Sequence, residues 1–331
     1  MFWLTISCVK GVGDKTLIEL YEKYPQLHFD NIKEHLESSK SKRLSKLLSD
    51  EHIEAAKEKA EKLIEIHKKN DIHVIPISSE SYPNYLKLIH DPPAVLYAKG
   101  NIALLKEENT LAVVGTRKPT EIGLKSAQKI STTFAERGYT IVSGLALGID
   151  TAGHEGALHV EGGKTIAVMA GELTKIYPAK NKGLADEILN KNGLLLSEIP
   201  IGQGNSRGNF VKRDRIQSGL SLGVCPVQTP ISSGTQHTIK FAREQKRYLF
   251  TPIPLKADEQ KEAIQGNLEL IKAGVTVLEN KDSYDTIHND LMEVKISLVN
   301  EYKERFIHNE EEIGHMEDNK ENNYKQLEFF K

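Results

Sequence analysis

The chain has 331 residues, which is enough for two domains, and 39% of them are hydrophobic, which is enough for a sizeable buried core. The formal net charge of −2 does not mark a nucleic-acid binder, although residues 1–280 are mildly basic and residues 281–331 carry 13 acidic and 7 basic residues. No uninterrupted apolar stretch approaches the ~20 residues of a membrane span, and the start of the chain lacks the basic residues of a signal peptide. Cys8 and Cys225 lie in apolar runs and predict buried free thiols. We expect a cytoplasmic enzyme or binding protein without a metal site.

Residues 1–70 have a helical pattern and are rich in lysine. The turn Gly11-Val12-Gly13, placed between an apolar segment and a helix, is typical of a helix-hairpin-helix, which presents backbone N–H groups to a DNA phosphate. The alternative is a small helical domain in which these residues only pack. Ala55 to Lys69 predicts a charged amphipathic helix whose lysines form its solvated face.

The pattern changes at Asp71. Ile72 to Ile77 predicts a strand, and turn signals such as Asp91-Pro92-Pro93 surround a second short strand at Val95 to Tyr97. We interpret this stretch as the joint between two domains, resting on the first edge of a sheet.

Two strand-turn-helix units follow, between Leu111 and Asp150. The first predicts a buried strand at Leu111 to Val114 and a helix at Gly123 to Arg137; the second predicts a strand at Thr140 to Val142 and a helix capped by Asp150. Strand ends and helix starts in such units meet at one edge of the sheet, where free N–H groups and the helix dipole favour an anion. Arg117 would lie at that edge, which predicts a phosphate site.

Further strands and helices alternate along the rest of the chain. This spacing predicts a doubly wound α/β fold with a mostly parallel sheet and helices on both faces. The predicted strands are Thr165 to Met169, Leu194 to Glu198, Leu222 to Val227, Tyr248 to Phe250 and Val275 to Leu278, and the helices include Phe210 to Leu220, one capped by Ser233-Gly234-Thr235, and Leu268 to Ala273.

Seven motifs follow one another along the chain: GTRKPTEIG from Gly115, SGLALGIDTAGHEGAL from Ser143, YPAKN from Tyr177, LLSE from Leu195, FVKRDRIQSGLS from Phe210, SSGTQHTIKFA from Ser232 and the stretch from Gly266 to Gly274. Their order resembles that of the DNA-processing protein A family (DprA, also called Smf). The resemblance covers about residues 70–280 and implies an extended Rossmann-like fold, a homodimer, binding of single-stranded DNA and delivery of incoming strands to a RecA-type recombinase in natural transformation.

The same residues predict a binding pocket for the sugar-phosphate chain. Arginines are forked donors suited to phosphate oxygens, and small residues at strand ends and helix starts let the backbone approach a nucleotide closely. His154 we assign to a structural role beneath the first turn of its helix. The predicted DNA- and phosphate-binding residues are Gly115, Arg117, Thr120, Ser143, Gly144, Gly148, Lys180, Asn181, Arg213, Arg215, Ser233, Gly234 and Thr235.

Two positions depart from the family pattern. An Arg-Asn-Arg is usual where this chain has Arg213-Asp214-Arg215, and an acidic residue is usual where it has Gln228. Asp214 would partly neutralise the arginines or hold one in a local ion pair, which weakens the electrostatic affinity for DNA. The uncharged Gln228 removes a negative charge and would strengthen that affinity. The net effect on DNA binding stays open.

The tail from Lys281 lacks the pattern of the winged-helix domain that ends many family members. Leu291 to Ile307 predicts one amphipathic helix, and Asn309 to Asn323 is polar and acidic and predicts disorder. The final Gln326, Leu327, Phe329 and Phe330 resemble the peptide that bacterial proteins insert into the sliding clamp. The alternative is that the terminal aromatic pair folds back onto the body.

Three segments therefore follow from the sequence: a helical domain at 1–70, a Rossmann-like domain at 71–280 and a tail at 281–331. The favoured function is a non-catalytic binder of single-stranded DNA that works with a recombinase and needs no cofactor. The alternative is a nucleotide-sensing or nucleotide-processing protein of the same superfamily, for example in phage defence. The stretch from Ile231 to His237 lacks the double glycine and the acid of nucleotide-cleaving relatives, so hydrolysis is not expected.

Overall fold

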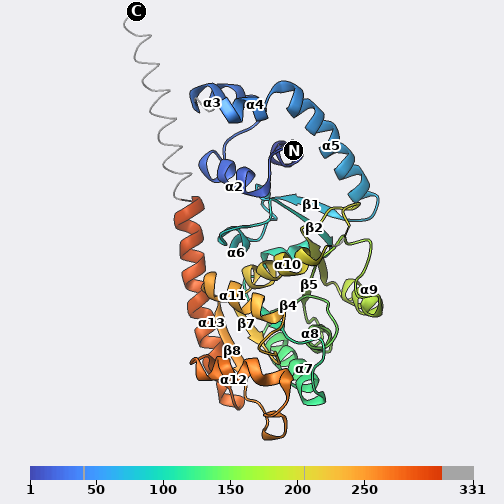
Figure 1. The fold of residues 1–331 in the computed structure, drawn as a ribbon, viewed down its shortest axis with the longest axis vertical. Coiled ribbons are helices and arrows are strands. Elements are labelled where there is room, and N and C mark those ends of the chain that lie inside the picture. Colours follow the sequence, from blue (N-terminus) through green and yellow to red (C-terminus); the bar gives the residue numbers. More distant parts are fainter. Residues whose placement is uncertain (40–41, 205, 308–331) are drawn as a thin grey trace, which may run out of the picture.

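A single mixed sheet forms the centre of the molecule (Figure 1). The computed structural model describes residues 1–39, 42–204 and 206–307, with the side chains of residues 37–43 left out. Within them, nine strands follow the order β1-β2-β6-β5-β4-β3-β7-β8-β9, parallel from β6 to β9 and antiparallel at β1 and β2, which confirms the mostly parallel α/β fold. The strands are β1 His73–Pro76, β2 Val95–Gly100, β3 Thr110–Val114, β4 Thr140–Ser143, β5 Thr165–Met169, β6 Leu194–Ser197, β7 Gly223–Pro226, β8 Tyr248–Pro252 and β9 Thr276–Leu278.

Both faces of the sheet are buried, which is why β3 is an unbroken apolar run. Leu111 and Val113 belong to one core cluster, whereas Ala112 and Val114 belong to the other, as the two-residue period of a strand requires. Helices α7 (Glu121–Glu136), α8 (Ile149–Leu158) and α13 (Lys281–Tyr302) contribute to the first cluster. The second receives α9 (Lys182–Asn190), α10 (Arg207–Leu220) and α11 (Thr235–Glu244).

The N-terminal helices share the second core cluster. Trp3 is buried in the same cluster as Leu96 of β2. His67 stacks on the ring of Tyr97 at 4.5 Å between centroids, and its Nε2 accepts a hydrogen bond from the Ile201 N–H at 3.0 Å. The sheet therefore supports these helices, which are α1 Phe2–Ser7, α2 Asp14–Lys23, α3 Ile32–Ser39, α4 Lys42–Leu47 and α5 Asp50–Lys68.

The C-terminal helix is longer than the sequence predicts. It begins at Lys281, where Asn280 and Ser283 form a capping box, rather than near Leu291, and it is followed by a π-helical turn at Lys303–Ile307. The helix runs along one side of the molecule toward the N-terminal helices (Figure 1). The segment predicted to be disordered and the predicted clamp peptide lie outside the described residues.

The predicted cap of α8 is wrong. Gly148, not Asp150, precedes the helix as its N-cap, with φ +84°, a conformation that favours glycine. The carboxylate of Asp150 instead accepts hydrogen bonds from the N–H groups of Gly144 and Ala146, at 3.2 and 3.3 Å. Asp150 therefore orders the turn between β4 and α8 from inside the first helical turn.

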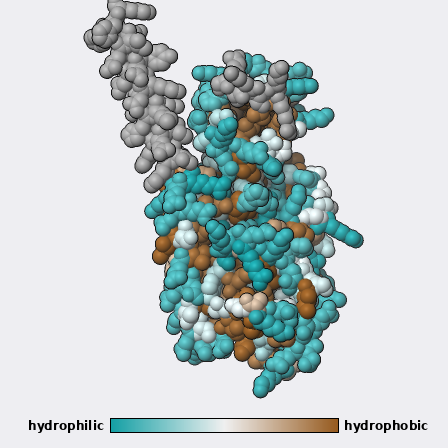
Figure 2. Space-filling view, turned by 60° about the vertical axis from the view of Figure 1, so that its left-hand side comes forward, coloured by the Kyte–Doolittle hydropathy of each residue, from teal (hydrophilic) through white to brown (hydrophobic). Residues whose placement is uncertain are grey.

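Short connecting elements complete the chain. They are α6 Asn84–Lys87, η1 Ile102–Lys106, η2 Ala179–Asn181, η3 Lys256–Asp258, η4 Glu262–Ile264 and α12 Gln265–Lys272. Among the described residues, no helix combines the length and apolar character needed to cross a membrane. Figure 2 shows a largely hydrophilic face on which hydrophobic residues are exposed in separate patches.

Candidate functional site at the sheet switch point

A crevice lies beyond the carboxyl ends of β3 and β7, where the strand order changes direction. This is the position at which doubly wound sheets bind ligands. The crevice has a volume of about 420 Å³, and we call it the switch-point crevice. Its lining includes Gly115, Arg117, Lys118, Asp150, Phe210, Arg213, Asp214, Gln217, Ser232, Ser233, Gly234, Thr235 and His237.

Small residues and a helix start form one wall of the crevice. A Cβ at Gly115 would lie 2.8 Å from the carbonyl oxygen of Gln228 and 2.6 Å from Cγ1 of Ile149, so a larger residue has no room there. Gly234 is the N-cap of α11, and Thr235 begins the helix. The positive end of the α11 dipole and its first N–H groups therefore favour an anion in this crevice.

Arg213 is a buried arginine at the floor of the crevice. Its side chain is 7% exposed, and Nη1 donates hydrogen bonds to the carbonyl oxygens of Gly144 and Val168, both at 2.6 Å. Its Nε donates to Oδ1 of Asp214 at 3.1 Å, which is the local ion pair that the sequence suggested. Arg213 thus ties the ends of β4 and β5 to α10 and holds charge beneath the crevice.

Two buried carboxyl groups lie beside Arg213. Burial raises the pKa of Asp214 to about 6, with Arg213 opposing the shift and Asp150 adding to it. Burial also raises the pKa of Asp150, again opposed by Arg213. The charge of the crevice therefore depends on pH near neutrality, because Asp214 changes its protonation state there.

Arg215 does not line the switch-point crevice. Residues two apart on a helix face different sides, and Arg215 points to Glu198 and Asp91. Its Nη2 lies 2.7 Å from Oε2 of Glu198, and its Nε lies 3.0 Å from Oδ2 of Asp91. Burial favours its neutral form, but these carboxylates outweigh that effect and raise the pKa of Arg215. The structure therefore does not bring Arg213 and Arg215 together as one phosphate clamp.

An aromatic and cationic rim adjoins the crevice. The guanidinium of the exposed Arg117 lies over the ring of Phe210 at 5.3 Å, and the ring of Tyr177 meets Phe210 edge-on at 5.8 Å. With Lys175 and others, these residues also line a side pocket of about 70 Å³. Phe210 and Tyr177 were missed as site residues because only the tertiary structure shows that they are near Arg117.

The remaining predicted residues support the site without lining the switch-point crevice. Thr120 caps α7, and its hydroxyl donates a hydrogen bond to the Asp258 carboxylate at 2.7 Å. The Ser143 hydroxyl donates a hydrogen bond to the Val113 carbonyl at 2.7 Å. Asn181 donates to the Leu145 carbonyl at 2.8 Å, and Lys180 is exposed. Gly144 lines the side pocket, with no room for a Cβ beside Arg213, and Gly148 caps α8.

Gln217 is a further crevice residue that sequence reasoning missed. Its side chain is buried, at 2% exposure, and its Nε2 has no hydrogen-bond partner among the described residues. An unused buried donor costs about 1–3 kcal/mol, so the amide is suited to a ligand acceptor.

His154, by contrast, is a structural residue as predicted: it is fully buried, and its Nδ1 lies 2.7 Å from Oγ1 of Thr165.

The fold and the crevice together define a Rossmann-like α/β protein with a candidate anion-binding crevice at its switch point. Residues 73–288 match the sequence model of DNA recombination-mediator protein A, and the chain belongs to this family. It is 41% identical to DNA processing protein DprA of Bacillus subtilis over 60% of this chain, and 34% identical to protein Smf of Synechocystis over 84% of it. These alignments span 66% and 69% of the relatives' own lengths.

Solved structures of the family have the same fold. DprA of Streptococcus pneumoniae aligns with a TM-score of 0.60 and 30% identity, covering 79% of this chain and 94% of that one. DprA of Helicobacter pylori, whose structure concerns single-stranded DNA binding, aligns with a TM-score of 0.58 and 28% identity, covering 66% of this chain and 96% of that one.

Proposed function

We propose that this protein is a non-catalytic mediator of DNA recombination that binds single-stranded DNA across the switch-point crevice and its aromatic rim. The observation that carries the proposal is the position of Arg117 over Phe210, at the edge of a crevice faced by the start of α11. Membership of the family and the DNA-binding relative from Helicobacter pylori support it.

In this proposal, phosphates bind to Arg117, Lys118 and the first N–H groups of α11. Guanidinium and ammonium groups supply charge, and the helix start supplies aligned donors. A base stacks on Phe210, because aromatic rings bind unpaired bases through their faces. Arg213 acts as a positioning residue, since its donors are already bonded to backbone carbonyls.

A salt-dependent titration of single-stranded and duplex oligonucleotides tests the proposal. Single strands should bind more tightly, and log K should fall linearly with log salt because counterions are released. Arg117→Ala should reduce the salt slope by about 1, and Phe210→Ala should weaken single-strand binding by roughly fivefold or more.

Arg243→Ala is a matched control, because Arg243 is exposed in the last turn of α11, away from the crevice. Its titration should match that of the unmodified protein. If Arg117→Ala and Phe210→Ala titrate like this control, the DNA site is elsewhere.

The partners and location belong to the same proposal. We propose delivery of strands to a RecA-type recombinase in the cytoplasm, and a homodimer, for which the exposed side chains of Ile231, Ile253 and Leu255 offer apolar surface. Binding to a sliding clamp through Gln326, Leu327, Phe329 and Phe330 stays a prediction. Light scattering of the purified protein tests the dimer.

One observation favours the alternative of a nucleotide-sensing or nucleotide-processing protein. Asp150 and Asp214 place carboxyl groups in the crevice, which sequence reasoning did not find there. Both groups are engaged, however, by backbone N–H groups or by Arg213. Mononucleotides that raise the melting temperature more than oligonucleotides do, or that release free base on incubation, would favour the alternative.

A further inference from the structure

A second cavity lies at the opposite end of β3 from the switch-point crevice. Its lining includes Thr110, the first residue of that strand, whereas Val114 and Gly115 line the crevice. Thr110 and Val114 are four residue steps apart along the strand, which is roughly 13 Å. The cavity has a volume of about 190 Å³ and lies between β3, α6, η1 and the end of α13; we call it the α13 cavity.

The walls of the α13 cavity combine apolar side chains with polar and charged ones. A comparable cavity lined by aliphatic and aromatic residues, of roughly 150 Å³, holds benzene, so this one accommodates a benzene-sized ring with a few more atoms. The apolar side chains that line it include Leu104, Leu105, Leu220, Val299 and Ile307.

One buried hydroxyl in this wall lacks a partner. Tyr85 is only 5% exposed, and its hydroxyl has no hydrogen bond among the described residues. Burial raises the pKa of Tyr85, so the phenol keeps its proton and is a donor. A buried hydroxyl without a partner is costly, which makes it a candidate anchor for a ligand acceptor.

Four charged residues line the α13 cavity, namely Lys106, Glu107, Glu108 and Lys303. Glu107 is paired with Lys164 at 2.6 Å and Glu108 with Lys295 at 2.8 Å, so both carboxylates are compensated. Lys106 donates to the Tyr82 carbonyl and to Oδ1 of Asn84, which are neutral acceptors.

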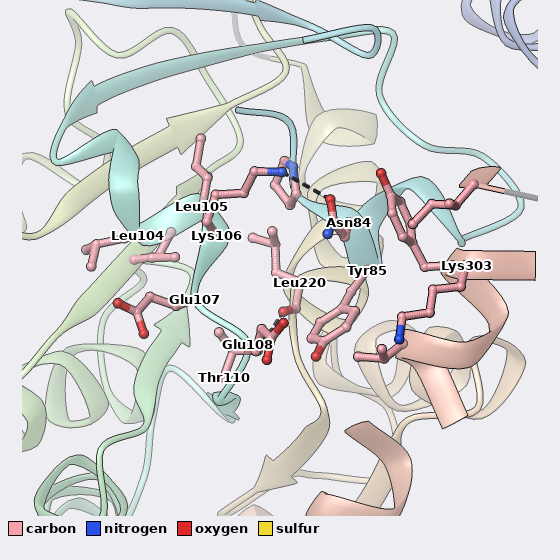
Figure 3. Close-up of a pocket in the computed structure, with 15 residues that line it drawn as sticks. Asn84, Tyr85, Leu104, Leu105, Lys106, Glu107, Glu108, Thr110, Leu220 and Lys303 are labelled. Carbon is pink, nitrogen blue, oxygen red and sulfur yellow. Dashed lines mark hydrogen bonds between the residues drawn. The ribbon is translucent and has the colours of Figure 1, made fainter. Parts of the chain in front are cut away.

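Lys303 supplies a second positive charge. Its ammonium has no salt-bridge partner in the part of the chain that the structure describes, and Figure 3 shows Lys303 and Glu108 on either side of the Tyr85 ring in that view. Lys303 begins the π-helical turn that ends at Ile307, another lining residue.

We propose that the α13 cavity binds a small carboxylate with an aromatic or branched aliphatic body. The body fills the apolar walls, the Tyr85 hydroxyl donates to one carboxylate oxygen, and the Lys303 ammonium pairs with the other. The bound molecule contacts β3 and the end of α13 together, and so links the C-terminal helix to the sheet. This proposal does not rest on DNA binding, because the two sites are at opposite ends of β3.

Phenylacetate is a suitable probe, since it combines one ring with one carboxylate. Ligand-observed NMR and thermal melting of the full chain should give saturable binding with a Kd on the order of 1 mM, as expected for about ten heavy atoms. Benzylamine and benzyl alcohol, which have the same ring with a cationic or a neutral group, should bind much more weakly.

Three variants locate the probe. Tyr85→Phe and Lys303→Met should each weaken phenylacetate binding by roughly tenfold, as expected for a hydrogen bond or ion pair to a charged group. Val299→Phe should abolish binding by filling the cavity. Lys129→Met, an exposed site on α7, is the matched control and should bind like the unmodified protein.

Several results would overturn the proposal. They are no binding at about ten times the expected Kd, equal binding of benzylamine, or an unchanged Kd in Tyr85→Phe and Lys303→Met. Retained affinity in a folded Val299→Phe, judged by its melting curve, would also place the probe outside the cavity.

Discussion

At the scale of single residues, Asp214 determines the pH response of the switch-point crevice. Its pKa is raised from 3.8 to about 6, mainly by burial, so in the folded protein it changes from protonated to ionised as the pH rises through about 6. An ionised carboxylate beside Arg213 repels a phosphate. We therefore expect the affinity for single-stranded DNA to rise as the pH falls through 6.

Asp214→Asn tests this expectation and restores the usual Arg-Asn-Arg of the family. The variant should bind DNA more tightly at pH 7.5, and its affinity should depend less on pH. Parallel pH profiles for the two proteins would contradict the role given to Asp214.

The same pKa shift has a consequence for stability. A carboxyl whose folded-state pKa is raised contributes stability that is present below its unfolded pKa and is lost as the pH rises through the folded pKa. Asp214→Asn should therefore stabilise the protein at pH 7.5, and the difference should disappear near pH 4. Urea unfolding of both proteins at pH 7.5 and pH 4 measures this difference in the free energy of unfolding.

At the scale of elements, the Arg215 to Glu198 ion pair joins α10 to the end of β6. Both side chains are at most 10% exposed, so removal of one partner leaves a buried charge. We expect Arg215→Met to lower the free energy of unfolding by about 3–5 kcal/mol, and the double variant with Glu198→Leu to recover part of it. Urea unfolding measures both.

Asp91→Asn is the control for this prediction. The Asp91 side chain is 59% exposed, and its loss should cost less than about 1 kcal/mol. If Arg215→Met instead keeps full stability and reduces the salt slope of DNA binding as Arg117→Ala does, Arg215 contacts DNA and its structural role is disproved.

At the scale of the whole molecule, the N-terminal helices and the sheet should unfold together. Trp3, the one tryptophan of the chain, reports on the N-terminal helices, and it is buried in a cluster that continues to the sheet. Urea transitions followed by Trp3 fluorescence and by far-ultraviolet circular dichroism should coincide. An earlier fluorescence transition would mean that residues 1–70 form an independent domain.

The sequence alone was sufficient for the elements of the sheet and for the position of the crevice beyond the strand ends. Unbroken apolar runs such as Leu111 to Val114 predict buried parallel strands, and the polar turns after them predict an anion site, because both depend on local pattern. The family resemblance rested on the order of the motifs, and the family match over residues 73–288 confirmed the family.

Only the tertiary structure decided which side chains reach that site. Arg213 and Arg215 look equivalent in the sequence, but they lie roughly 200° apart around α10. The first therefore points to the crevice and the second to Glu198. Phe210 meets Arg117, Gln217 enters the crevice, and Tyr85 lines a cavity closed by α13, through contacts between distant segments. Local pattern specifies elements, whereas a site depends on how those elements are rotated and packed against one another.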